Sequence, residues 1–391
     1  MIESTVSQQL REQMPVAKTL AYLDHAAVAP LPKVTAESMQ SWLDEATSQG
    51  DLCWPQWAKR VEVIRGNVAK LIGSNADEIA FTPNTSTGIN YVAEGFPWND
   101  GENIVTFANE FPTNLYPWMN LQSRGVTTRT VEIEQGIPDL NRLFDCCDQR
   151  TRVISLSWVS YSSGYRFTKE QLQSIVEEAH QRGIYVMLDA IQGLGIFPLD
   201  VTDLKIDFLA ADGHKWMLGP EGAGIFYMRK QHLDLLRPLM VGWNSVASPF
   251  NFSKIDWKPR QQAARYEGGS QNMVGIHGFG ASLELLQELG VSPTKSPVAD
   301  EILNYTRCAQ EQLNELGAEI YGSPLTTQQS GITSFTIPNV DLAHLRSQCM
   351  KSGIILSHRD GRLRISPHAY NNQDDLNRLL NLIRTMLRQA D

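Results

Sequence analysis

A lysine near the middle of the chain stands where an enzyme could use its amine. Lys215 lies in LAADGHKWMLGPEGAG, after a β-rich run and before a Gly/Pro-rich turn from Gly219 to Gly224. This spacing predicts a position at the carboxyl end of a strand, where open α/β sheets carry their sites. Lysine forms Schiff bases with aldehydes, and partial burial lowers its pKa enough to make the amine nucleophilic. The alternative is a solvated lysine beside a surface loop.

A carboxylate lies about one strand-helix-strand unit before this lysine. Asp189 ends the apolar run of YVMLDAIQG, 26 residues before Lys215. A carboxylate at the end of a buried strand is costly without a cationic partner. A protonated pyridine nitrogen would be such a partner, and the ion pair would keep the ring an effective electron sink. The alternative is an aspartate that caps the following turn.

A run of small hydroxyl residues supplies a third element. The segment TPNTSTGIN (82–90) lies between an expected strand and an expected helix. Hydroxyl and amide groups at a helix N-terminus form a site for a phosphate, although Ser, Thr and Asn are also ordinary helix caps. An aldehyde, a pyridine nitrogen and a phosphate together describe pyridoxal 5′-phosphate (PLP). The three elements together therefore predict a PLP enzyme.

The elements that must position these residues follow an α/β pattern. Short β-rich segments alternate with helical ones between about 75 and 230, and the helical segment from Lys169 to Arg182 shows apolar residues at helical spacing. This alternation predicts a layered α/β domain with a mostly parallel sheet. The expected strands are EIAFT at 78, NIVTFA at 103, RVISLSWV at 152, YVMLDA at 185, DFLAAD at 207 and AGIFYM at 223.

The pattern changes after about residue 275, which predicts a second domain. Long helical segments there surround two short expected strands near Ile332 and Ile354. We expect an N-terminal segment (1–30) that packs on one of the domains, a large domain (31–270) and a smaller α+β domain (271–391). The length of 391 residues agrees with two or three domains.

Composition excludes several classes of protein. Hydrophobic residues make up 42% and charged residues 20%, as in ordinary globular proteins. The net charge of −9 offers no footprint for a nucleic-acid backbone. No apolar run approaches the roughly 20 residues of a membrane helix, and the N-terminus lacks a signal-peptide pattern. We expect no nucleic-acid or membrane partner and a cytoplasmic location. The five cysteines show no metal-ligand spacing, so we expect reduced thiols and no zinc.

The chain resembles the class V aminotransferase family of fold-type I PLP enzymes. That group includes cysteine desulfurases, carbon-sulfur lyases, kynureninase and isopenicillin N epimerase-like proteins. The resemblance rests on the order of the hydroxyl-rich turn, LDAIQG, GHKW with GPEGAG, and RISPHAYNN (364–372), and it runs from YLDHAA (22–27) to the last helix. It implies a large domain with a mostly parallel seven-stranded sheet and a smaller α+β domain.

The resemblance also implies roles for individual residues. Lys215 resembles the Schiff-base lysine, Asp189 the partner of the pyridine nitrogen, and Gln192 the group near the phenolic oxygen. The positions that match phosphate-binding residues are Thr85, Ser86 and His214.

Two further positions concern the substrate and a second subunit. Arg364 matches the arginine that clamps the substrate carboxylate, a task suited to its bidentate guanidinium. Ser270, in RYEGGSQN (265–272), resembles a hydroxyl residue that reaches the phosphate of the neighbouring subunit, so a homodimer with shared sites is implied. His25 is a further candidate for contact with the substrate.

Some positions depart from the family pattern. Phe111, in NEFPTNLYPW, stands where desulfurases have a stacked histidine, and phenylalanine can stack but cannot carry a proton. Tyr161 replaces an asparagine near the cofactor oxygen. Asp212 stands where several relatives have a hydroxyl residue that contacts the phosphate. An aspartate there would repel the phosphate, so Asp212 could instead orient His214.

The segment DLCWPQW (51–57) could line the site or pack in the core.

The cysteine of the desulfurases has no counterpart at its usual place. Desulfurases carry it on a loop between the strand that resembles GIIL (353–356) and the carboxylate-binding arginine, and here that stretch is only SHRDGRL. Cys349 precedes the strand in a helical stretch, where an inert packed thiol is the better interpretation. Desulfuration through a protein persulfide is therefore disfavoured.

These features favour a carbon-sulfur lyase that eliminates the β-substituent of a cysteine-type amino acid. Elimination needs neither the missing cysteine nor the missing histidine. A class V aminotransferase and an epimerase remain alternatives, and the epimerase would need a second base, for which Tyr161 and His25 are candidates. A PLP-binding protein without turnover is the alternative of another class.

Overall fold

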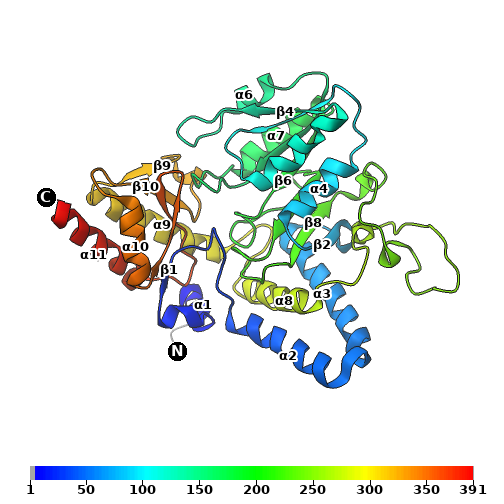
Figure 1. The fold of residues 1–391 in the computed structure, drawn as a ribbon, viewed down its shortest axis with the longest axis horizontal. Helices are drawn as coiled ribbons and strands as arrows, with labels where there is room; N and C mark the ends of the chain where they lie inside the picture. The colour runs from blue at the N-terminus through cyan, green and yellow to red at the C-terminus, as the bar shows by residue number, and fades with distance from the viewer. Residues whose placement is uncertain (1–4, 391) are drawn as a thin grey trace.

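The computed structural model describes residues 5–390 and consists of a large sheet with helices on both faces, together with a smaller sheet (Figure 1). The large sheet has seven strands in the order β2-β8-β7-β6-β5-β3-β4. All neighbours are parallel except at β8, which is antiparallel to both β2 and β7. The strands are β2 (Ile79–Thr82), β3 (Asn103–Phe107), β4 (Thr127–Val131), β5 (Thr151–Ser157), β6 (Tyr185–Asp189), β7 (Phe208–Asp212) and β8 (Gly224–Met228).

All six strands expected from the sequence are present in this sheet, and β4 is the one that the sequence analysis did not identify. The pattern of β4, TTRTV, contains only one buried residue, Val131, because the strand lies at the edge of the sheet. The central strands are buried throughout, as parallel strands covered on both faces require. The predicted fold class is confirmed.

Helices cover both faces of the large sheet. Helix α7 begins with a Thr168 capping box, and its four buried apolar residues recur at helical spacing. Helix α4 approaches strand β7 closely, because a Cβ atom on Gly88 would lie 2.6 Å from the Cβ atom of Ala210. The helices of this part of the chain are α2 (Lys33–Gln49), α3 (Trp54–Ile72), α4 (Thr85–Gly95), α5 (Tyr116–Met119), α6 (Leu140–Asp145), α7 (Lys169–Gln181) and α8 (Met273–Glu288).

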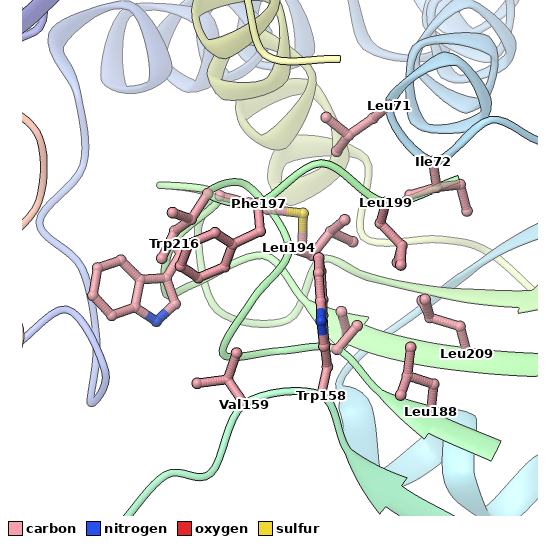
Figure 2. Close-up of a cluster of buried hydrophobic side chains, with 14 of the residues drawn as sticks. Leu71, Ile72, Trp158, Val159, Leu188, Leu194, Phe197, Leu199, Leu209 and Trp216 are labelled. Carbon is pink, nitrogen blue, oxygen red and sulfur yellow. The ribbon is translucent and has the colours of Figure 1, made fainter. Parts of the chain in front are cut away.

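The main hydrophobic core lies between the sheet and these helices. Trp158, Phe197 and Trp216 gather around Leu194 in it (Figure 2), and the rings of Trp158 and Phe197 meet edge to face at 6.1 Å. Trp216 is fully buried. Because it follows Lys215 directly, its burial fixes the backbone that carries the lysine.

The smaller sheet has four antiparallel strands in the order β12-β13-β10-β9. It packs with helices α9, α10 and α11 at the left of Figure 1. Its elements are β9 (Glu319–Tyr321), β10 (Thr333–Thr336), β12 (Ser357–Arg359), β13 (Arg362–Ile365), α9 (Pro297–Glu315), α10 (Leu342–Lys351) and α11 (Gln373–Ala390). The expected strand near Ile332 corresponds to β10, and the one near Ile354 is β11 (Ile354–Ile355).

The N-terminal segment crosses between the two sheets. Helix α1 (Val6–Glu12) is followed by β1 (Ala21–Tyr22), which pairs in parallel with β11. Helix α8 begins the range expected for the small domain, but its side chains Ile276, Phe279 and Leu283 belong to the core of the large sheet. The division of the chain into 1–30, 31–270 and 271–391 stays a prediction.

No helix among residues 5–390 is long and apolar enough to cross a membrane.

Candidate active site

Four strands end at the same edge of the large sheet and bring their last residues together. Ser157 of β5 lies opposite Asp189 of β6, and Asp212 of β7 lies opposite Gly224 of β8. Thr82 of β2 also pairs with Gly224, so it shares this edge. Because parallel strands end at one edge, the loops that follow them surround a common space.

A cavity of about 240 Å³, open to solvent, occupies that space. Nine of the eleven predicted site residues line it, which are Thr85, Ser86, Phe111, Tyr161, Asp189, Gln192, His214, Lys215 and Arg364. The other lining residues are Ala26, Ala27, Val28, Asn84, Thr113, Ser157, Val159, Ile191, Asp212 and Arg359.

Lys215 and Asp189 are buried at this cavity and carry shifted pKa values. Burial lowers the pKa of Lys215 to about 8, Asp189 raises it again, and Arg364 and Arg359 lower it further. Burial raises the pKa of Asp189 to about 6. The hydrogen bond from the N–H group of Ile191 and the charge of Lys215 both act in the opposite direction and lower this pKa. Within residues 5–390, the Lys215 amine takes part in no hydrogen bond or ion pair. Both groups are thus available to a ligand.

The N-terminus of helix α4 faces the cavity with hydroxyl groups. Asn84 caps the helix by accepting a hydrogen bond from the N–H group of Thr87 at 2.9 Å. Thr85 accepts one from the N–H group of Asp212 at 2.9 Å, and the hydroxyls of Ser86 and Thr113 lie 2.9 Å apart. The first turn of a helix leaves N–H groups without partners in the helix, which suits an anion.

The Asp212 carboxylate contacts two residues of its own loop. Its Oδ1 atom accepts a hydrogen bond from the N–H group of Gly213 at 2.7 Å. Its Oδ2 atom lies 2.8 Å from Nδ1 of His214, although the two groups do not have the geometry of a hydrogen bond. The expectation that Asp212 orients His214 stays a prediction.

Gln192 ties three segments together at the wall of the cavity. Its amide donates to the carbonyl oxygen of Ala26 at 3.0 Å, and its carbonyl accepts from the indole of Trp216 at 2.8 Å. The amide therefore joins the N-terminal segment to the chain beside Lys215.

Arg364 is almost fully buried and is held by three partners. Its guanidinium donates to the backbone carbonyl of Tyr161 at 2.9 Å, to Asp24 at 3.2 Å and to the hydroxyl of Ser357 at 3.5 Å. Burial lowers the pKa of Arg364, and Asp24 opposes that shift. These contacts fix the orientation of a cation that lines the cavity.

Two aromatic rings form another part of the wall. The Phe111 ring meets the ring of Tyr161 edge to face at 5.2 Å, and its centre lies 5.6 Å from Nζ of Lys215. Phenylalanine has no proton to transfer. Here Phe111 can only shape the space above the lysine.

Two predicted site residues do not line the cavity. His25 is fully buried, with Nδ1 at 3.0 Å from the carbonyl oxygen of Ser366 and Nε2 at 3.0 Å from the hydroxyl of Tyr370. Burial holds the pKa of His25 well below its usual value. This histidine supports the segment that carries Ala26. Ser270 is exposed and lines a separate surface recess.

The segment DLCWPQW also lies away from the cavity. Trp57 packs against Trp42 at 4.9 Å and donates to Glu45 at 2.7 Å, while Trp54 contacts Phe250. None of the five cysteines, all of which lie within the described residues, lines the cavity. Cys349 is fully buried in α10, and burial raises its pKa to about 12.

The sequence analysis missed some residues at the site, among them Arg359, Thr113, Ser157 and Glu110. Ser157 ends β5, two residues before the end that the sequence predicted for this strand. Thr113 lies in the segment NEFPTNLYPW, where the sequence indicated only Phe111. Arg359 lies in the stretch SHRDGRL, where only a cysteine was sought.

Glu110 is a buried carboxylate behind Phe111. It accepts hydrogen bonds from the N–H group of Ser157, at 2.7 Å, and from the hydroxyl of Ser157. Burial raises the pKa of Glu110 to about 7; the bonds from Ser157 oppose this shift, and the charge of Asp189 adds to it. The structure thus holds two buried carboxyl groups with raised pKa values beside the cavity.

The raised pKa of Glu110 predicts a pH dependence of stability. A carboxyl group whose pKa is raised by folding stabilises the folded state at any pH below its pKa in the unfolded chain. That stabilisation is lost as the pH rises through the folded-state pKa, here about 7. Glu110→Gln should therefore gain stability relative to the wild type between pH 5 and 7.5, by up to about 3 kcal/mol. Urea unfolding of the cofactor-free protein across that range measures the difference. Glu221→Gln, at an exposed turn, is the matched control, and equal pH profiles for all three proteins would contradict the assignment.

Comparisons with known proteins agree with this geometry. A "Probable cysteine desulfurase" of Methanothermobacter thermautotrophicus is 30% identical in an alignment of 393 positions that covers 95% of each chain. The apo cysteine desulfurase of Thermococcus onnurineus shares the fold with a TM-score of 0.88 at 22% identity, over the full length of both chains.

A second solved protein with this fold is the cystine C–S lyase C-DES. Two of its structures match with TM-scores of 0.88 over 96% of this chain, at 21% and 22% identity and over 99% and 100% of their own chains. One holds glycine covalently linked to the PLP cofactor, and the other holds the reaction product cysteine persulfide. The sequence model of the family described as Aminotransferase class-V matches residues 21–379. The chain belongs to the class V aminotransferase family.

Proposed function

We propose that the protein is a PLP-dependent carbon-sulfur lyase that acts on a cysteine-type L-amino acid. The observation that carries this proposal is a cavity that combines Lys215, Asp189 and Arg364 and that none of the cysteines lines. The relatives named as cysteine desulfurases and the cystine C–S lyase of the same fold support a substrate of this class.

The residues present fit PLP. Lys215 offers a buried amine without a partner within the described residues, and Asp189 offers a buried carboxylate for a protonated ring nitrogen. The helix N-terminus with Thr85 and Ser86, together with His214, offers donors for the phosphate. When bound, PLP supplies a ring that withdraws electrons from the bonds at the substrate α-carbon.

Each residue around that ring has one task. Arg364 binds the α-carboxylate, with an orientation fixed by Asp24 and Tyr161. Lys215 removes the α-proton, for which a pKa of about 8 leaves a useful fraction of neutral amine at neutral pH. Asp189 keeps the ring nitrogen charged. Phe111 and Tyr161 limit the space above Lys215.

The balance of the reaction follows from these roles. The C–H bond at the α-carbon breaks, its proton passes to Lys215, and the C–S bond at the β-carbon breaks with the electron pair leaving on sulfur. Water then releases pyruvate and ammonia from the remaining three-carbon unit. For cysteine, the sulfur product is hydrogen sulfide, and no step needs a thiol of the protein.

The hairpin between β12 and β13 supports elimination over transfer of sulfur to the protein. Arg359 pairs directly with Arg362, so only Asp360 and Gly361 form the turn. A cysteine on a mobile loop, as the resemblance to desulfurases would require, has no counterpart there. We propose that sulfur leaves the site as a small molecule.

We also propose that two copies of the chain assemble. Loop 241–258 exposes several large apolar side chains, including Phe252 (69%), Ile255 (90%) and Trp257 (58%), and it projects at the right of Figure 1. Monomers rarely expose contiguous patches of this kind. Ser270 lines the same surface recess as Trp243 of this loop. A second copy would cover the loop and receive Ser270 at its phosphate.

A cytoplasmic location is proposed as well, and the five free cysteines support a reducing compartment.

Covalent attachment of PLP is the first test. The native protein loaded with PLP should show a visible absorption band, and borohydride should reduce the C=N bond to Lys215 and leave a modified peptide that mass spectrometry locates. Lys215→Ala should show neither the reduced adduct nor pyruvate formation, whereas Lys169→Ala, on the exposed start of α7, should behave like the wild type. A borohydride-stable adduct on another lysine would refute the assignment.

The cysteines should be dispensable for turnover. Single replacement of each of the five by alanine should leave kcat/KM for L-cysteine or L-cystine within about threefold of the wild type, because none lines the cavity. Pyruvate and sulfide are assayed together, and D-enantiomer and keto-acid assays separate an epimerase or a transaminase. Loss of sulfide release, but not of folding, in one cysteine variant would indicate a persulfide route instead.

Dimerisation should depend on the exposed loop. Phe252→Glu should reduce the mass in solution from that of two chains to that of one, because a carboxylate cannot be buried in an apolar contact without a partner. Leu325→Glu places the same charge on an exposed apolar residue between β9 and β10 of the smaller sheet and serves as the control. Sedimentation equilibrium gives both masses; a wild-type protein with the mass of one chain would exclude the proposal.

A further inference from the structure

The loop that carries Lys215 follows strand β7 and includes a strained backbone conformation. Leu218 in this loop has a φ of 57°, in the left-handed region that residues other than glycine rarely adopt. Such a conformation persists only where the surrounding groups fix it. The groups that hold this loop therefore also determine where the Lys215 amine lies.

Distant segments bind the backbone carbonyl oxygens on either side of Lys215. The carbonyl oxygen of His214 accepts a hydrogen bond from the N–H group of Ala29 at 2.7 Å, and that of Trp216 lies 3.3 Å from Nε2 of His368. Of these two donors, only His368 is a side chain. A substitution of His368 would thus free the peptide that follows the lysine and leave the bond from Ala29 in place.

The contact with Trp216 determines which nitrogen of His368 carries the proton. A carbonyl oxygen can only accept, so Nε2 must be the donor. Burial lowers the pKa of His368 to about 4, so the ring is neutral at neutral pH and Nδ1 carries no proton. Nδ1 is buried and has no hydrogen-bond partner among residues 5–390. Because a buried acceptor without a partner is costly, an apolar side chain in this place would avoid that cost but would lose the Nε2–H donor.

The ring of His368 is held in place by other rings. It is fully buried, and its centre lies 6.0 Å from the indole of Trp216, 5.3 Å from the ring of His25 and 6.2 Å from the ring of Tyr370. A side chain enclosed in this way has little freedom to turn away from its hydrogen bond. The donor is therefore presented to the Trp216 carbonyl in a fixed direction.

One short segment carries both His368 and Arg364. Arg364 lies in strand β13, and His368 follows four residues later. Between them, Ser366 donates its N–H group to the carbonyl oxygen of Leu23 at 2.7 Å and accepts from the N–H group of His25 at 3.0 Å. The arginine that binds the substrate carboxylate in the proposed function and the donor to the Lys215 loop thus belong to the same firmly bonded segment.

We propose that His368 is a positioning residue for Lys215: its Nε2–H group holds the Trp216 carbonyl and keeps the lysine amine aligned with a carboxylate on Arg364. His368 does not line the cavity, so it acts through the loop rather than by contact with a ligand. The alignment with a substrate carboxylate rests on the proposed function. The hold on the Lys215 loop does not, because it exists in the protein alone.

The reactivity of the Lys215 amine tests this hold without cofactor or turnover. Trace acetylation of the cofactor-free protein over a range of pH, followed by mass spectrometry of the Lys215 peptide, gives the midpoint at which the amine becomes reactive. Burial should place the midpoint of the wild type near the Lys215 pKa of about 8. His368→Leu should raise it by about one pH unit, because a loosened loop lets the amine reach water.

Matched variants separate the hydrogen bond from packing. His368→Gln keeps an N–H donor and should keep the midpoint within about 0.3 pH unit of the wild type. His368→Phe keeps a ring but no donor, and it should behave like His368→Leu. His344→Leu, on the exposed side of α10, is the control, and circular dichroism checks folding. An unchanged midpoint in either folded apolar variant, or an equal shift in His368→Gln, would overturn the proposal.

The native chain provides a test that does not depend on the folding of a variant. In protein labelled with ¹⁵N in its eight histidines, NMR should show His368 with a proton on Nε2 and none on Nδ1 between about pH 5.5 and 9. Comparison with His368→Gln assigns the signals. A proton on Nδ1, or a charged ring in that range, would overturn the proposal.

Turnover separates this proposal from the function on which it rests. In the PLP-loaded protein, His368→Leu should lower kcat for pyruvate formation from L-cysteine at least about tenfold and change KM less than about threefold. His368→Gln should restore most of kcat. A rise in KM without a fall in kcat would reject positioning. A wild type that forms no pyruvate would reject the lyase, while the acetylation midpoint and the labelled histidine would still decide the role of His368.

Discussion

The burial of Lys215 beside Asp189 is the constraint on which the rest of the site depends. Neither group can be left without compensation in a wall of the core, because a buried charge without a partner is costly. The pair compensates in part, since each shifts the pKa of the other toward the charged form. Neither carries a hydrogen bond from the other, however, so the arrangement remains open to a ligand that brings a cation to Asp189 and a carbonyl carbon to Lys215.

The fold holds this pair in place from two directions. Strand β6 fixes Asp189 through its pairing with β5 and β7, and the buried indole of Trp216 fixes the backbone next to Lys215. Gln192 then joins the indole to the N-terminal segment at Ala26. The segment that begins the chain is therefore part of the cavity wall, although it lies nearly 200 residues from Lys215 in sequence.

Sequence reasoning identified the residues that end strands, because strand periodicity and direction are local properties. Asp189, Lys215 and the hydroxyl turn at 85–86 follow from that rule. Arg359 and Glu110 do not, since their roles depend on which distant groups surround them: Arg359 on the register of a two-residue turn, and Glu110 on Ser157 in another strand. For His25, a local motif led to a prediction that the folded structure does not support. Its place in a motif indicated contact with the substrate, but the folded chain surrounds it with Ser366 and Tyr370.

The length of the β12–β13 hairpin connects these observations with reaction type. A short turn keeps both strands paired to their ends, and pairing fixes which face each arginine presents. A longer loop in the same place would free the backbone to carry a reactive side chain toward the substrate, at the expense of that fixed face. The short turn in this chain therefore carries no mobile cysteine, and it holds Arg359 and Arg364 in fixed positions. Chemistry at the β-carbon then depends on which groups the substrate itself brings, rather than on a thiol supplied by the protein.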